Sequence, residues 1–174
     1  ETLEYMSTNN DIVYCPFPYG YSNYSRKGFR DSIIKFTNTP SFNQDKNDCS
    51  GSQIGGTGLA ISKETSNIDI ALEYVFWVAS AECQKSLYYS SGGQPGNFEA
   101  WKDESINLDS NDFFKSTFET LDRSWLRPRY DGYMYYQDIA GTIINKYLSS
   151  DTSVELVINE LKIEFEKSFY VNKK

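Results

Sequence analysis

The chain has 174 residues, with a hydrophobic fraction of 39% and a charged fraction of 24%, values typical of a soluble globular domain. Its net charge of −7 argues against nucleic acid as a partner, because the chain repels a phosphate backbone. It contains no histidine, so neither a metal nor a proton shuttle of the usual kind is expected, and no cofactor motif is present. The 14 Tyr and 11 Phe instead suit a flat or ring-shaped ligand.

The first residues predict the end of a helix. Leu3 and Met6 lie three positions apart, as on one helix face, and no N-cap residue precedes them. The chain also begins at Glu1 without methionine or a signal peptide. We therefore expect a fragment of a longer protein.

The first hundred residues contain three short stretches with the composition of strands. These are residues 11–15, 33–37 and 59–61, the last of which is expected to be buried. Polar residues predict a surface loop over 38–52, and a loop rich in tyrosine fills 17–29. Within that loop, Tyr19 and Tyr24 are the candidates for ligand contact.

Two glycine turns bracket the helical region of this first part. The first turn opens the sequence GGTGLAIS at 55–62, and the second is GGQPG at 92–96. Glycine has no side chain in the way and tolerates positive φ, so a ligand can approach the backbone closely. Both turns therefore predict binding geometry.

The residues between the two turns predict two consecutive helices. Ser66 or Asn67 can cap the first, which continues to residue 79. Its apolar face recurs with helical spacing at Ala71, Tyr74, Val75, Val78 and Ala79. Ser80 offers an N-cap for a second helix over 81–89, which the second glycine turn ends.

The rest of the chain is predicted to be helical. Residues 102–112 are polar without periodicity and predict a connecting loop. Helical patterns follow at 112–125, 136–148 and 153–169. Thr152 and Glu155 form a capping box for the last of them. We predict an α/β portion over 1–104 and a helical portion over 105–174.

Planar donors and aromatic rings gather between two of these helices, in the sequence RPRYDGY at 127–133. Bidentate guanidinium donors and tyrosine rings suit a polyhydroxylated ligand such as a sugar. Surface salt bridges of Arg127 and Arg129 are the alternative interpretation. Trp101, just past the second glycine turn, fits either a stacking platform or a core position.

Catalytic groups are less evident. The carboxylate pairs are Asp103 with Glu104 and Asp109 with Asp112, and they lie in the polar stretch whose simplest interpretation is a solvated loop. No histidine is present to activate a serine. No catalytic residue is therefore predicted.

The three cysteines lack metal-binding spacing. Cys83 lies within a helical pattern and predicts a buried thiol. Cys15 and Cys49 are able to form one disulfide, a pairing that the sequence leaves open.

Four motifs, taken in order, resemble the C-terminal part of bacterial extracellular solute-binding proteins of family 1, the carbohydrate-binding components of ABC importers. They are GGTGLAIS at 55–62, ALEYVFWVAS at 71–80, GGQPG at 92–96 and RPRYDGYMYYQD at 127–138. The resemblance covers nearly the whole chain.

This resemblance implies an α/β fold, the C-terminal part of a two-lobed, type II periplasmic-binding-protein-like clamshell that is rich in helix towards its C-terminus. It implies a carrier and not an enzyme, with a sugar or small solute as ligand and the permease subunits of an ABC importer as partner. It places the protein outside the cytoplasm, as an extracellular, membrane-anchored protein or in the periplasm.

The resemblance also implies a set of ligand-binding residues. From one lobe these are Gly55, Gly56, Thr57, Gly93 and Gln94. From the other lobe they are Arg129, Tyr130, Tyr135 and Tyr136. Thr57 departs from the family, where many members have an aromatic residue, so the stacking platform stays open.

Two other functions remain as alternatives. A glycan-active enzyme domain would use the carboxylate pairs, held roughly 5–10 Å apart in a cleft. A catalytically inert interaction domain would dock a partner through the aromatic residues of 14–29.

Overall fold

The computed structural model describes residues 2–9, 11–16, 18–40 and 52–171. The chain forms two compact units, Glu1–Leu126 and Arg127–Lys174. The boundary predicted after residue 104 falls inside the first unit. Most of the loop predicted at 38–52 lies outside the described residues. Cys49, one half of the possible disulfide, also lies outside them.

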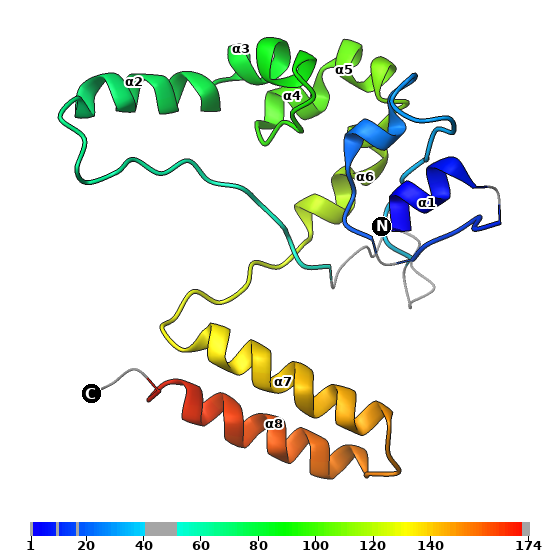
Figure 1. Ribbon diagram of the computed structural model, residues 1–174, viewed down its shortest axis with the longest axis vertical. Coiled ribbons are helices and arrows are strands. Elements are labelled where there is room, and N and C mark those ends of the chain that lie inside the picture. The colour runs from blue at the N-terminus through cyan, green and yellow to red at the C-terminus, as the bar shows by residue number, and fades with distance from the viewer. Residues whose placement is uncertain (1, 10, 17, 41–51, 172–174) are drawn as a thin grey trace. The chain divides into compact units, whose positions relative to one another are not determined.

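Helices dominate both units and account for 54% of the structure. In the first unit they are α1 (Thr2–Thr8), η1 (Ser22–Ser25), α2 (Ile68–Ala79), α3 (Ala81–Cys83), η2 (Gln84–Tyr88), α4 (Phe98–Lys102), α5 (Glu104–Asp109) and α6 (Phe113–Asp122). In the second unit they are α7 (Tyr133–Leu148) and α8 (Val154–Ser168). Figure 1 shows their order along the chain.

The described residues form no sheet, so the expected α/β clamshell is wrong for this chain. Among the described residues, β-type backbone pairing is limited to two isolated bridges, Lys27–Arg30 and Gln53–Trp125. The segments predicted as strands at 11–15, 33–37 and 59–61 have no strand partner in the part of the chain that the structure describes. A strand is stable only when its backbone groups are hydrogen-bonded to a neighbour, and local composition supplies no neighbour. The segment predicted to be buried is in fact exposed, with Leu59 at 53%.

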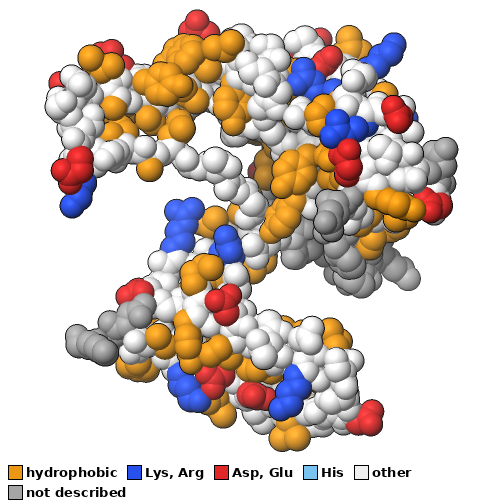
Figure 2. Space-filling model, viewed as in Figure 1, with side chains coloured by type: hydrophobic (Ala, Val, Ile, Leu, Met, Phe, Trp, Pro, Cys, Tyr) orange, Lys and Arg blue, Asp and Glu red, His pale blue; other side chains and the backbone are white. Residues whose placement is uncertain are grey.

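Helix α2 forms where the sequence predicts it, yet none of its residues is buried. Figure 1 shows the helix reached by a long extended segment and joined to α3 at its C-terminal end. Its large apolar side chains lie on every side except near Asp69 and Glu73, and Figure 2 shows hydrophobic atoms gathered along it. A helix that is apolar all round is normally buried. The periodicity predicted a buried face, and within the described structure α2 lacks one.

Ser80 ends α2 and starts α3, as predicted. Its Oγ donates to the carbonyl of Trp77 at 2.6 Å and accepts from the backbone N–H of Cys83 at 3.2 Å. One side chain thus caps the ends of both helices. Cys83 is 3% exposed, which confirms the predicted buried thiol.

The core of the first unit is aromatic and lies among η2, α4, α5 and α6. Its buried members are Tyr89, Ala100, Trp101, Ile106, Phe113 and Phe114. The ring centroids of Trp101 and Phe114 lie 5.0 Å apart, edge to face. The indole N–H of Trp101 donates to the carbonyl of Pro95 at 2.8 Å. Trp101 is therefore a core residue, and its interpretation as a stacking platform is not supported.

The loop predicted at 102–112 is wrong, because residues 104–109 form α5. The Oδ1 atom of Asp103 accepts from the backbone N–H groups of Ser105 and Ile106 at 3.0 and 3.2 Å, as an N-cap does. Ile106 then enters the core at 2% exposure. A single buried apolar residue in a short helix gives no periodic signal, which is why the sequence pattern missed it.

The second unit is a pair of helices, α7 and α8, lying side by side (Figure 1). Ile143 and Val157 are its buried apolar residues among those described. The predicted capping box is displaced by one position, because Ser153 is the N-cap of α8 and its Oγ accepts from the N–H of Leu156 at 3.4 Å.

Candidate functional site

The first glycine turn leaves its backbone open. Residues 55–61 are extended, and no backbone hydrogen bond involves them within the described part of the chain. A Cβ placed on Gly56 or Gly58 would meet no atom within 4 Å. Thr57, between them, is exposed. The N–H and C=O groups of this segment are therefore accessible to a solute.

An exposed aromatic ring lies against one end of this segment. The nearest atom to a Cβ placed on Gly55 would be Cε1 of Tyr19, at 3.3 Å. Tyr19 is 58% exposed, and the side-chain amide of Gln53 donates to its hydroxyl at 3.4 Å. We call the set of Tyr19, Gln53, Gly55, Gly56 and Thr57 the diglycine platform. It combines a ring face, an amide and free backbone groups.

An isolated bridge holds the platform in place. The N–H of Trp125 donates to the carbonyl of Ser52 at 3.0 Å, and the N–H of Ile54 donates to the carbonyl of Trp125 at 3.1 Å. The hydroxyls of Ser52 and Thr39 share a hydrogen bond of 2.8 Å. These bonds fix the chain immediately before Gly55, so the open backbone begins at a defined place.

The second glycine turn is engaged with the protein itself. The amide oxygen of Gln94 accepts from the N–H of Ser22 at 2.7 Å, and its nitrogen donates to the carbonyl of Gly20 at 3.2 Å. A Cβ on Gly93 would lie 2.7 Å from the carbonyl oxygen of Tyr88, so only glycine fits there. In this structure Gln94 therefore binds the backbone at and just before the start of η1, and Gly93 packs closely against the C-terminal end of η2.

The tyrosines of the second unit divide into two groups. Tyr130 stacks on Phe169 with centroids 4.4 Å apart, and its hydroxyl shares a hydrogen bond of 2.8 Å with Ser168. Tyr136 packs edge to face on Phe165 at 5.2 Å, and burial raises the pKa of its hydroxyl. Tyr135 remains 39% exposed. Tyr130 and Tyr136 therefore pack α7 against α8, while Tyr135 is accessible.

The two arginines of the same unit also differ. Arg127 donates to the side-chain oxygen of Gln137 at 3.0 Å. Arg129 is exposed and makes no side-chain hydrogen bond or ion pair with the described residues. Its guanidinium is thus the available planar donor of this junction.

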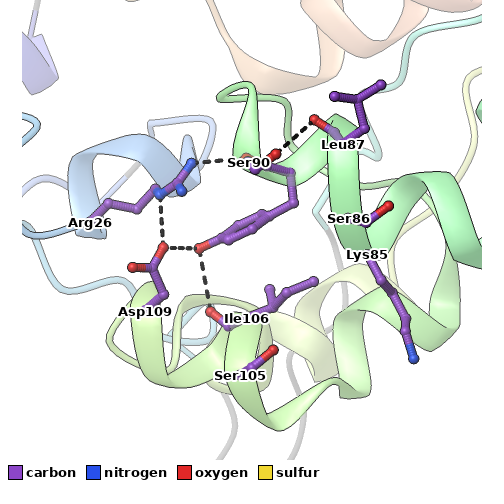
Figure 3. Close-up of a pocket in the computed structure, with 9 residues that line it drawn as sticks. Arg26, Lys85, Ser86, Leu87, Ser90, Ser105, Ile106 and Asp109 are labelled. Carbon is purple, nitrogen blue, oxygen red and sulfur yellow. Dashed lines mark hydrogen bonds and ion pairs between the residues drawn. The ribbon is translucent and has the colours of Figure 1, made fainter.

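A separate depression of about 680 Å³ opens beside Arg26, Tyr89 and Asp109 (Figure 3). The guanidinium carbon of Arg26 lies 4.2 Å from the centroid of the Tyr89 ring, and its Nε is 3.0 Å from Oδ2 of Asp109. The Tyr89 hydroxyl donates to the same carboxylate oxygen at 2.7 Å. Burial, followed by this hydrogen bond, raises the pKa of Tyr89.

These three side chains are hydrogen-bonded or ion-paired with one another, and they connect the end of η1 to the end of η2 and to α5. Arg26 also donates to the carbonyl of Tyr89 at 3.1 Å. The arrangement is a structural crosslink in an open depression, because its strongest donors and acceptors are already paired. No local sequence signal could have found it, since Arg26 lies 63 and 83 residues from its partners.

One member of each predicted carboxylate pair also has structural partners. Asp103 caps α5, and the hydroxyl of Ser105, with the N–H of Ile106, lowers the pKa of its carboxyl. Asp109 accepts from Arg26 and Tyr89 as described. No group of three or more carboxylates or cysteines in the described residues is arranged to hold a metal.

No family model, curated protein or solved structure matches this chain. Within the described ranges, no helix combines the length and the apolar character needed to cross a membrane.

Proposed function

We propose that this chain binds a carbohydrate or a related small solute as part of the carrier component of an ABC-type importer, outside the cytoplasm. The diglycine platform is the observation that carries the proposal. A ring face packs against the C–H face of a sugar, while exposed backbone groups and an amide bond its hydroxyls. The order of the sequence motifs supports the same class of protein, and the proposal does not depend on the clamshell fold.

The residues predicted from the resemblance contribute unequally to this proposal. Gly55, Gly56 and Thr57 in the first unit, with Tyr19, are accessible to a solute. Arg129 and Tyr135 are accessible in the second unit. In the first unit we assign ligand contact to the residues of the diglycine platform, and Arg129 and Tyr135 are the accessible candidates of the second unit, considered by themselves. The other predicted residues make the internal contacts described above. The permease subunits of an importer are the proposed protein partner.

The same geometry supports binding over catalysis. A pair of carboxylates that cleaves a glycosidic bond needs both carboxyl groups free to act on the substrate. Asp103 instead holds a helix N-terminus, and Asp109 is held by a guanidinium and a phenol.

The test is binding to a panel of neutral mono- and oligosaccharides, measured by titration calorimetry and by a glycan array. Tyr19→Ala is expected to weaken binding by about 0.5–1.5 kcal/mol, the contribution of one aromatic contact. Tyr14 provides a matched control, because it is also exposed, at 61% against 58% for Tyr19, and lies in the same loop region. Tyr14→Ala is expected to leave affinity unchanged. Absence of binding to every sugar would refute the proposal.

Arg129 gives an independent test in the second unit. A guanidinium that donates to buried sugar hydroxyls contributes roughly 1–3 kcal/mol, whereas a solvated surface charge contributes almost nothing. Arg129→Ala should therefore weaken binding by that amount, and Arg127→Ala should not, because Arg127 donates to Gln137. Equal affinities for wild type and a folded Arg129→Ala variant would remove Arg129 from the site.

A further inference from the structure

We infer that Trp125 is a second aromatic platform beside Tyr19, and that the site therefore binds two joined sugar rings, an oligosaccharide, in preference to a monosaccharide. This inference rests on the proposed function. Trp125 was not among the candidate residues identified from the sequence.

The first step is that Trp125 and the platform share one face. Gln53 and Trp125 are direct partners in a parallel bridge, so their side chains leave the backbone on the same side. Side chains along an extended segment alternate, so the side-chain direction of Gly55 is that of Gln53. The ring of Tyr19 occupies the space into which a Cβ of Gly55 would point. Tyr19, Gln53 and Trp125 therefore lie on one face of residues 52–56.

The second step is that both rings are available. Trp125 is 44% exposed and Tyr19 is 58% exposed. Neither makes an aromatic contact with another described ring, and two backbone hydrogen bonds to Ser52 and Ile54 position Trp125. Part of its indole therefore remains accessible at a defined place.

The third step concerns spacing. Tyr19 contacts the chain at Gly55 and Trp125 pairs with it at Gln53, two residues earlier. Two residues of extended chain span roughly 6.4–6.8 Å. Two rings presented along such a line fit successive rings of one oligosaccharide, and Gln53, opposite Trp125, adds a hydrogen-bonding amide that also donates to the Tyr19 hydroxyl.

The other tryptophans do not offer such a surface. Trp101 is in the core at 8% exposure. Trp77 is 41% exposed, but its ring lies against Tyr74 on α2, with centroids 6.0 Å apart. Trp77 is therefore a matched control, equally exposed and remote in sequence from the platform.

The experiment uses the full chain on a glycan array that carries mono-, di- and trisaccharides of glucose, galactose, mannose and xylose. Affinities for the bound sugars are then measured by titration calorimetry. A disaccharide should bind about tenfold more tightly than its monosaccharide, the effect of one added aromatic contact. Trp125→Ala should remove that difference. Trp125→Phe should retain most of the difference, and Trp77→Ala should retain all of it.

The outcomes separate this inference from the proposed function. Binding of disaccharides that is unchanged in Trp125→Ala would overturn the inference alone, as would equal affinities for mono- and disaccharides. Loss of disaccharide binding in Trp77→Ala as well would also overturn it, because the effect would then not be specific to Trp125. Failure to bind any sugar on the array would overturn both.

Discussion

Gly132, at the N-terminus of α7, gives the sharpest test of the second unit. Its φ is +109°, outside the range that residues with a side chain readily adopt. A Cβ at this position would also collide with the carbonyl oxygen of Ser168 at the end of α8. Gly132→Ala therefore combines two costs, backbone strain and displacement of the neighbouring helix end.

The magnitude follows from the contacts at this point. The left-handed conformation costs about 1–2 kcal/mol for a residue with a Cβ. Moving Ser168 weakens its 2.8 Å hydrogen bond with Tyr130, worth about 1 kcal/mol, and disturbs the stack of Tyr130 on Phe169. We expect Gly132→Ala to destabilise the helix pair by about 2–4 kcal/mol.

Hydrogen exchange followed by mass spectrometry measures this locally, on peptides from α7 and α8. Exchange should accelerate about 30- to 1000-fold, or until protection is lost. Two controls separate the causes. Gly28 has φ +84° but open space around it, so Gly28→Ala should show strain alone in the first unit. Gly141 lies within α7 with nothing near, so Gly141→Ala should slow exchange slightly, by about 0.5–1 kcal/mol. Unchanged exchange in Gly132→Ala would refute the reasoning.

Two further predictions concern the first unit. Tyr89→Phe removes the hydrogen bond to Asp109, so we expect a loss of about 1.5–3 kcal/mol in urea unfolding at pH 7. Because the pKa of Tyr89 is raised on folding, the stability that its hydroxyl contributes is present below pH 10 and declines at higher pH. The free energies of unfolding of the wild type and the variant should therefore converge above pH 10. A difference between them that widens above pH 10 would contradict this. Asp103→Ala should lower the melting temperature by an amount equivalent to about 1 kcal/mol, the effect of a lost N-cap, and Asp103→Asn by much less. Since the pKa of Asp103 is lowered on folding, its charge contributes above about pH 4 and this contribution is lost as the pH falls below that value. Asp103→Asn should therefore show less acid sensitivity than the wild type, and identical pH profiles would exclude the carboxylate as the cause.

Long helices were predictable because their signal is local and repeated. The pattern around Val75 gave α2, and those around Ile143 and Val157 gave α7 and α8, within a few residues of their ends. The N-cap at Ser80 was also correctly predicted, since a capping residue acts on the next turn of its own chain. The strands were wrong because a strand depends on a neighbour that local composition cannot specify.

The candidate site was predictable only in part, for the same reason. Glycine pairs and the arginine-tyrosine junction were visible in the sequence, but their availability was not. Tyr130 is used in packing and Arg129 is accessible, although they are adjacent in the sequence. That difference depends on Phe169, which lies 39 residues from Tyr130 and meets it only when α8 folds back.

The sequence by itself determined the long helices, the lack of histidine and the position of two glycine turns, because these depend on residue type and short-range spacing. Tertiary structure decided which of the glycine turns is open. Gln94 binds the backbone of residues 20–22 and engages the second turn, while Trp125 fixes the chain before Gly55 and leaves the first turn free. Both outcomes rest on hydrogen bonds between residues about 70 positions apart, which no local pattern encodes.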